Sequence, residues 1–327
     1  MDAERPQGKG ARKMNFRFGD WMSMARGANL PTVWSNVIAA WAINAGAGPS
    51  LRWMPEWTDM AFFHFPTLGW LLIGGSLVYA GGCFLNDVFD HSFDQEHRPE
   101  RPLPSGKLSL SQGWALALLQ LSAGTSALIL GAGCAWKWTA ALLLCLLVYN
   151  WVHKKTAWGI VLMGGCRTLL WITAGTAAAG MSPAPLLYVW AVVVGIYVVG
   201  ISWFARNESK SKKAESKESW TARIPVLLLM GMPMIALGYL VLWNNLDPIR
   251  TFLANLAGLL AGGVVFFAIL KMREKEDRVI GDGVSRLLAG ICAVDATALS
   301  FHAPLLVGPC ILLGAIAHIL QKRFAAT

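Results

Sequence analysis

Long apolar runs alternate with short polar segments along most of this chain. The runs are about 17 to 24 residues long, and a helix of about 20 residues crosses the hydrocarbon core of a bilayer. Small residues within them allow membrane helices to approach closely. The pattern predicts an all-α, polytopic membrane bundle of nine to ten transmembrane helices. The predicted spans are 30–47, 66–86, 112–133, 135–151, 157–180, 185–205, 224–243, 251–271, 285–301 and 303–320.

The composition supports a membrane protein and excludes several other classes. Of 327 residues, 55% are hydrophobic and 14% are charged, whereas a soluble domain holds about 25% charged residues. These values do not fit a soluble globular, disordered, collagenous or disulfide-rich secreted chain. The six cysteines lie in apolar runs without a CxxC pair, so no disulfide framework or zinc site is expected. We expect one transmembrane domain over 1–327, whose basic segment 1–20 is flexible and contains no cleavable signal peptide.

The positive charges indicate which side of the membrane each loop faces. Of 28 Lys and Arg residues, one lies inside a span, three lie in alternate loops and 24 lie in the remaining polar segments, namely 1–29, 87–111, 152–156, 206–223, 271–286 and 321–327. Lys and Arg accumulate on the cytoplasmic side of membrane proteins. The sequence therefore predicts an integral, multi-pass protein with a cytoplasmic N-terminus. The net charge of +9 reflects orientation and attraction to anionic lipid, not nucleic-acid binding, and no protein partner is indicated.

An acidic cluster follows directly on the second predicted span. Asp87, Asp90 and Asp94 are spaced so that a continuing helix places them on one face. Three carboxylates at a helix C-terminus repel one another and the negative end of the helix dipole. Oxygen ligands in this arrangement suit Mg²⁺, which commonly shares its coordination shell with substrate phosphates. The alternative is a solvated acidic loop that forms salt bridges to Arg98 and Arg101.

The residues around this cluster resemble a known family. Asn86 and the three aspartates form the pattern Asn-Asp-x-x-Asp-x-x-x-Asp, followed by Arg-Pro-Leu-Pro-Ser-Gly over 101–106. This is similar to the first signature of the UbiA superfamily of membrane prenyltransferases. The segment from Arg26 to Pro31, which includes Asn29, resembles that superfamily's opening motif, and further matches are Tyr149, Lys154 and Lys155. The resemblance implies a helical bundle around a central cavity, capped by polar loops at its cytoplasmic end.

The resemblance also implies a reaction and roles for these residues. A prenyl group would pass from an isoprenyl diphosphate to a lipophilic acceptor, aromatic or hydroxyl-bearing. Mg²⁺, held by Asp87, Asp90 and Asp94 beside Asn86, would act as a Lewis acid on the leaving diphosphate. Fixed positive charge would come from Arg101, Lys154 and Lys155, and Asn29 and Tyr149 would bind substrate.

The chain departs from the superfamily after the sixth predicted span, where relatives carry a second aspartate-rich motif. Here the sequence runs from Phe204 to Lys210 without an aspartate, and Glu208 is the best-placed acid beside Arg206. One explanation is that a single Mg²⁺ and basic side chains suffice for catalysis. The other is a noncatalytic isoprenoid-lipid binding or transport protein that retains the cavity.

Two charged residues lie inside predicted spans. Arg167 and Asp295 are roughly 18 Å and 13 Å from the inner surface at 1.5 Å per helical residue. Charges at this depth cost about 2.5–3.5 kcal/mol on insertion scales, so both should face the bundle interior. We expect them to pair or to line the acceptor site. Asn36 lies at a similar depth and is predicted to form a hydrogen bond between helices.

Overall fold

The computed structural model is all-helical in its described part, which comprises residues 16–45, 65–154, 156, 158–177, 183–211, 224–243, 248–272 and 277–323. The helices are α1 (Phe18–Met24), α2 (Leu30–Ala45), α3 (Phe65–Phe89), α4 (His91–His97), α5 (Leu110–Ser126), α6 (Trp136–Val152), α7 (Gly159–Gly175), α8 (Pro185–Ser211), α9 (Ile224–Trp243), α10 (Pro248–Met272), α11 (Asp277–Ala289), α12 (Ile291–His302) and α13 (Val307–Arg323). The all-α prediction is confirmed.

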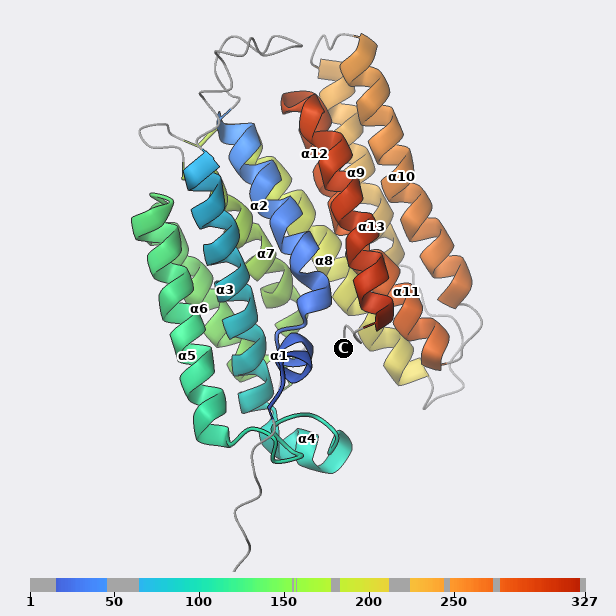
Figure 1. Ribbon diagram of the computed structural model, residues 1–327. Helices are drawn as coiled ribbons and strands as arrows, with labels where there is room; N and C mark the ends of the chain where they lie inside the picture. The colour runs from blue at the N-terminus through green and yellow to red at the C-terminus, as the bar shows by residue number, and fades with distance from the viewer. Residues whose placement is uncertain are drawn as a thin grey trace, which may run out of the picture.

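The long helices run side by side as a bundle (Figure 1). Helix α2 lies at its centre and contacts α3, α7, α12 and α13. The short helices α1 and α4 lie at one end of the bundle, the end toward which the last turn of α13 also points (Figure 1). Side chains on α2 can therefore join elements from both halves of the chain.

Six helical stretches in the described residues are long and apolar enough to cross a membrane, namely Phe65–Phe89, Leu110–Gly131, Pro185–Arg206, Pro248–Leu270, Gly281–His302 and Pro304–Arg323. The helices α6 and α7 are apolar but shorter. The ribbon thus places a helix over each of the ten predicted spans, but the predicted number of nine to ten crossings is not confirmed.

Small residues bring α3 and α5 into close contact. A Cβ atom added at Gly81 on α3 would lie 3.0 Å from the backbone nitrogen of Leu121, and one added at Gly124 on α5 would lie 2.8 Å from that of Val78. Any larger side chain at either position would force the two backbones apart. Close backbone approach through small residues is a common way to pack membrane helices, whose association gains little from the hydrophobic effect. This packing fixes the position of α3, which carries the acidic cluster.

The predicted span 285–301 divides into two helices at Gly290. Helix α11 ends at Ala289 and α12 begins at Ile291. The Tyr197 hydroxyl donates a hydrogen bond of 3.0 Å to the carbonyl oxygen of Leu287, beside the division. The contact ties α8 to the end of α11. Helix α12 continues from there and carries Asp295 into the bundle.

Candidate active site

The acidic cluster lies at the junction of α3 and α4. Helix α3 ends at Phe89, but helical hydrogen bonds continue through the junction, from the Asp90 nitrogen to the Asn86 carbonyl and from the Asp94 nitrogen to the Asp90 carbonyl. The carboxylates of Asp87, Asp90 and Asp94 are all buried. The prediction that the three acids share one helical face is confirmed. The alternative of a solvated acidic loop is wrong in its exposure, because these carboxylates are buried, but the salt bridges to Arg101 that it expected are present.

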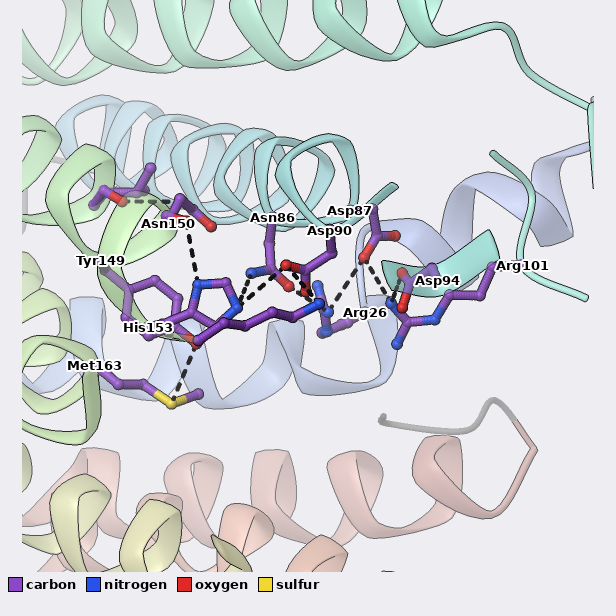
Figure 2. A network of polar contacts seen from close by, with 12 residues as sticks. Arg26, Asn86, Asp87, Asp90, Asp94, Arg101, Tyr149, Asn150, His153 and Met163 are labelled. Carbon is purple, nitrogen blue, oxygen red and sulfur yellow. Dashed lines mark hydrogen bonds and ion pairs between the residues drawn. The ribbon is translucent and has the colours of Figure 1, made fainter. Parts of the chain in front are cut away.

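Asp87 and Asp94 converge on a single positively charged atom. The Arg101 Nη1 atom lies 3.2 Å from Asp87 Oδ1 and 2.8 Å from Asp94 Oδ2. Arg101 follows α4 in the loop that leads to α5, so the loop folds back over the end of α3 (Figure 2). A cation therefore already occupies the position between two buried carboxylates.

Arg26 supplies a second positive charge from the N-terminal side of the bundle. Its Nη2 atom donates to Asn86 Oδ1 at 3.0 Å and contacts Asp87 Oδ1 at 3.3 Å. The Arg26 backbone has φ 45°, a left-handed conformation that costs a residue other than glycine about 1–2 kcal/mol. The ion pair with Asp87 and the hydrogen bond to Asn86 offset this strain. Sequence reasoning used Arg26 only as part of a motif and did not identify it as a site residue.

Asp90 contacts a different set of partners. Lys154 Nζ lies 2.9 Å and His153 Nε2 3.4 Å from Asp90 Oδ1. Burial raises the pKa of the Asp90 carboxyl, but the hydrogen bonds and charges of His153 and Lys154 outweigh burial, so this pKa lies below its usual value. His153 Nε2 is also 3.4 Å from Asn86 Nδ2. Figure 2 shows these contacts as one row across the ends of the helices.

We refer to these side chains together as the rim cluster, which comprises Arg26, Asn86, Asp87, Asp90, Asp94, Arg101, His153 and Lys154. Three carboxylates face three strongly basic side chains, and the histidine is an additional partner. The positive charge that the clustered acids required is thus present in the protein itself. A further anion entering the cluster would need a further cation.

Mg²⁺ in a protein needs oxygen ligands that converge on one point. Among the described residues, no group of three acidic, His or Cys side chains is arranged to hold a metal ion. The three aspartates do not meet at one point, because Asp90 turns toward Lys154. In proteins, however, Mg²⁺ is usually held by one or two carboxylates and completes its shell with water and substrate phosphates. The converging Asp87 and Asp94 carboxylates, with the Asn86 amide nearby, fit that mode of binding.

The other predicted substrate-binding residues occupy distinct positions. The Tyr149 ring stacks on His153 with centroids 5.1 Å apart. Asn29 is buried, and its Oδ1 atom accepts a hydrogen bond of 2.8 Å from Gln321 Nε2 on α13. Nothing in the sequence pointed to Gln321, which lies 292 positions away along the chain.

Three more predicted residues are Lys155, between α6 and α7, and Arg206 and Glu208, in the last turns of α8. Lys155 lies outside the described residues. Glu208 is in the last turns of α8, and its side chain is not among the described ones. The Arg206 Nη1 atom donates to the Thr156 carbonyl at 3.2 Å. This contact places Arg206 next to the loop that carries Lys154, and its predicted role in substrate binding stays a prediction.

Arg167 and Asp295 belong to a second polar group inside the bundle. Arg167 Nη1 donates to Asn36 Oδ1 at 2.9 Å, and Asn36 Nδ2 donates to the two Asp295 oxygens at 3.0 and 2.7 Å. Thr32 accepts from Arg167, and Ser35 donates to Asp295. We refer to these five residues as the interior layer. The Arg167 and Asp295 side chains do not form a direct ion pair; both form hydrogen bonds to Asn36. Asn36 therefore forms hydrogen bonds between helices, as predicted.

Comparison with known proteins gives the family. The model of the UbiA prenyltransferase family matches residues 35–281, well over half of the chain. The chain belongs to this family. The resemblance inferred from the acidic motif is thereby confirmed, and together with the apolar helices it identifies an integral, multi-pass membrane protein.

Individual members of the UbiA family are similar to this chain over parts of its length. It is 27% identical over 199 residues to the mitochondrial 4-hydroxybenzoate polyprenyltransferase of Schizosaccharomyces pombe, covering 59% of this chain and 50% of that protein. It is 41% identical over 49 residues to the digeranylgeranylglyceryl phosphate synthase of Sulfurisphaera tokodaii, covering 15% and 18%. The chain therefore spans half or less of the length of these relatives.

Solved structures agree on the fold. The apo structure of a UbiA homologue from Aeropyrum pernix K1 superposes with a TM-score of 0.58 at 14% identity, covering 87% of this chain and 98% of that one. A structure from work on digeranylgeranylglyceryl phosphate synthase gives 0.57 at 17% identity, covering 90% and 98%. The UbiA fold therefore extends over most of the chain.

Proposed function

We propose that this protein transfers a prenyl group from an isoprenyl diphosphate to a lipophilic acceptor within the membrane, with Mg²⁺ as cofactor. The observation that carries the proposal is the convergence of the Asp87 and Asp94 carboxylates on one cationic position, 3.2 and 2.8 Å from the same Arg101 nitrogen. Membership of the UbiA family supports prenyl transfer as the reaction class. The acceptor is an aromatic ring or a hydroxyl group on a lipid-soluble molecule.

The bonds that change define what the site must stabilise. The bond between C1 of the prenyl group and the diphosphate oxygen breaks, and its electron pair leaves with the diphosphate. The acceptor atom bonds to C1 and releases its proton to water. Negative charge thus grows on the diphosphate while positive charge grows on the allylic carbon. Fixed donors aimed at the growing negative charge are the largest source of rate enhancement in many enzymes.

Arg26, Arg101 and Lys154 are placed to meet the diphosphate. Each contacts a buried carboxylate at the same end of the bundle, so all three lie there before substrate arrives. Mg²⁺ between Asp87 and Asp94 would take the place of the Arg101 guanidinium and leave it free to contact the diphosphate. Their charges are balanced by the three aspartates, and an added diphosphate therefore requires additional positive charge. Asp87 and Asp94, with Asn86, would hold Mg²⁺, which supplies that charge and Lewis-acid stabilisation of the leaving group.

We further propose that the chain forms one domain whose N-terminus and rim cluster face the cytoplasm. The bias of Lys and Arg toward alternate segments supports this orientation. Arg26, Arg101 and Lys154 all lie in segments assigned to the positive side. A water-soluble diphosphate would then reach the rim cluster from the cytoplasm, and the acceptor would arrive from the lipid.

Labelled prenyl diphosphate and Mg²⁺ supplied to the purified protein in lipid, with a panel of acceptors, test the proposed function. Diphosphate release and labelled product are expected for the unchanged protein. The double variant Asp87→Asn/Asp94→Asn should lose at least about 100-fold in rate, because it removes both converging charges. Glu96→Gln is the matched control, since Glu96 is an exposed acid on α4.

The noncatalytic alternative predicts a different result in the same experiment. A binding or transport protein would retain prenyl diphosphate tightly in the presence of Mg²⁺ and release no diphosphate with any acceptor. That outcome would replace the proposed transferase activity with isoprenoid binding.

A further inference from the structure

Two of the six cysteines lie beside each other between α6 and α7. The sulfur atoms of Cys145 and Cys166 are 3.7 Å apart, although 21 positions separate the two residues along the chain. Both are free thiols and are partly exposed, whereas the other four cysteines are buried. The two thiols that lie close together are therefore also the two that a reagent can reach.

A glycine on α7 allows the two sulfur atoms to approach. A Cβ atom added at Gly165 would lie 3.2 Å from Cys145 Sγ, so a side chain at this position would crowd the Cys145 thiol. On the same side of α6, the Tyr149 hydroxyl lies 3.9 Å from Met163 Sδ on α7. These contacts hold α6 and α7 together at the level of the two thiols.

The hydrogen bonds of the two thiols assign them different roles. The Cys145 S–H donates to the Leu162 carbonyl, with sulfur and oxygen 3.5 Å apart. Because that hydrogen points to a carbonyl oxygen, which only accepts, the Cys166 S–H is the donor in the contact between the two sulfurs. Negative charge on Cys145 Sγ is therefore stabilised by the Cys166 S–H. The arrangement favours Cys145 as the attacking thiolate and Cys166 as the resolving thiol.

We propose that Cys145 and Cys166 form a dithiol site, which a hydroperoxide oxidises to a disulfide between α6 and α7. The Cys145 thiolate attacks the terminal oxygen of the hydroperoxide, the O–O bond breaks, and the alkoxide that leaves takes up the thiol proton. A sulfenic acid on Cys145 and an alcohol result.

The second step forms the disulfide. Cys166 Sγ attacks the Cys145 sulfur, the S–O bond breaks, and the hydroxide that leaves takes up the Cys166 proton to give water. In total, two thiols and one hydroperoxide give one disulfide, one alcohol and one water, and two electrons pass from sulfur to oxygen. An S–S bond is about 2.05 Å long, so each sulfur has to move by less than about 1 Å from its present position.

The surroundings of the two thiols favour a hydroperoxide that is dissolved in the bilayer. Exposed apolar side chains flank the pair, namely Leu144 on α6 and Val161 and Met163 on α7. Cys145 precedes the end of α6 at Val152 by seven residues, which is roughly 10 Å along the helix. An apolar hydroperoxide, such as an oxidised lipid, reaches this depth more readily than hydrogen peroxide does.

The full-length, reduced protein in lipid vesicles tests the proposal with cumene hydroperoxide and hydrogen peroxide at equal concentrations. The unchanged protein should lose the mass of two hydrogen atoms. Trypsin cleaves after Lys154, between the two cysteines, so a non-reduced digest should contain two peptides joined through Cys145 and Cys166. Dithiothreitol should reverse both changes. Cumene hydroperoxide should react at least about tenfold faster than hydrogen peroxide, because an apolar reagent concentrates in the bilayer.

Single substitutions test the two roles. Cys166→Ser removes the resolving thiol and should leave a sulfenic acid on Cys145, which dimedone labels. Cys145→Ser removes the attacking thiol, and dimedone labelling of Cys166 in this variant should be at least about tenfold weaker. Cys134→Ser, at a buried thiol, is the matched control and should form the same disulfide as the unchanged protein.

Each of the other outcomes contradicts one part of the proposal. A digest without the joined Cys145 and Cys166 peptides would overturn the dithiol site. Faster oxidation by hydrogen peroxide would place the oxidant in water and overturn the bilayer source. Stronger dimedone labelling of Cys166 than of Cys145 would overturn the order of attack. None of these measurements depends on prenyl transfer, and the digest of the unchanged protein decides the main point even if a variant fails to fold.

Discussion

The rim cluster and the interior layer both contain buried acidic side chains with basic partners, but the two groups differ in how far their basic side chains are exposed to water. Both balance buried carboxylates with basic side chains. At the rim, the cationic side chains keep contact with water, with 36% of Lys154 and 20% of Arg26 exposed. In the interior, 9% of Arg167 and 0% of Asp295 are exposed. The rim charges can therefore exchange partners with a ligand, whereas the interior charges depend on each other.

The difference in burial determines whether an ion pair contributes mainly to folding or can also exchange partners with a ligand. A charge with access to water has an alternative partner, so breaking its contact costs little. A charge in the membrane interior has no such alternative. We therefore expect changes in the interior layer to act mainly on folding and changes in the rim cluster to act mainly on ligand binding.

The largest effect on stability should come from removing one of the two charges in the interior layer. Asp295→Leu leaves the Arg167 charge without its counter-charge, and removing one member of a buried charge pair costs about 3–5 kcal/mol. Arg167→Leu/Asp295→Leu removes both charges and should recover most of this loss. The free energy of unfolding in mixed micelles measures both variants. Equal losses in the single and double variants would show that the charges do not depend on each other.

The next largest effect should come from Arg101, and it should have opposite signs for two ligands. Arg101→Gln leaves Asp87 and Asp94 facing each other without the cation between them. Mg²⁺ alone should then bind more tightly and diphosphate alone more weakly, each by about tenfold, since hydrogen bonds to charged groups contribute about 1.5–3 kcal/mol. Calorimetric titration measures each affinity. Arg98→Gln, at an exposed arginine in the same loop, should change neither, and parallel changes in both affinities would contradict the assigned geometry.

A smaller effect is expected where α13, the last helix, contacts the segment that precedes α2. Gln321→Leu removes the hydrogen bond to buried Asn29, which should cost about 1–2 kcal/mol because a buried acceptor is left without its donor. Thermal unfolding in detergent measures the loss. Lys322→Leu, at an exposed position on the same turn, provides the control. A Gln321 variant as stable as that control would show that the contact contributes nothing.

The smallest effect should appear at the exposed ion pair between α1 and the loop before α5. Lys107 Nζ lies 2.7 Å from Asp20 Oδ1, and Lys107 is about half exposed. Such pairs contribute about 0–1 kcal/mol and weaken in high salt. The hydrogen bond from Lys107 lowers the pKa of Asp20, so its contribution is present near neutral pH and is lost as the pH falls through that lowered pKa. Lys107→Ala should therefore leave neutral-pH stability nearly unchanged and raise the pKa of Asp20, as carbon-detected NMR would report.

The order of the elements followed from local sequence patterns. Apolar runs of sufficient length placed a helix over every predicted span, and the spacing of Asp87, Asp90 and Asp94 placed them on one helical face. Depth along a helix also follows from counting residues, which assigned Arg167, Asp295 and Asn36 to the interior. The number of residues along a helix does not reveal which side chain each charged group contacts. The three acids looked equivalent in the sequence, yet Asp87 and Asp94 share Arg101 while Asp90 contacts Lys154 and His153.

The amino-acid sequence alone determined the membrane class, the helical elements, the family-like acidic motif and the faces on which the charged residues lie. These properties depend on hydropathy and on the helical repeat, which are local along the chain. Only the tertiary structure brought Arg26 to Asp87, Asn36 to Asp295 and Gln321 to Asn29, across 61, 259 and 292 positions. The physical reason is that lipid is as apolar as a helix surface, so hydropathy does not select which helices meet. Close packing of small residues and hydrogen bonds between helices make that selection.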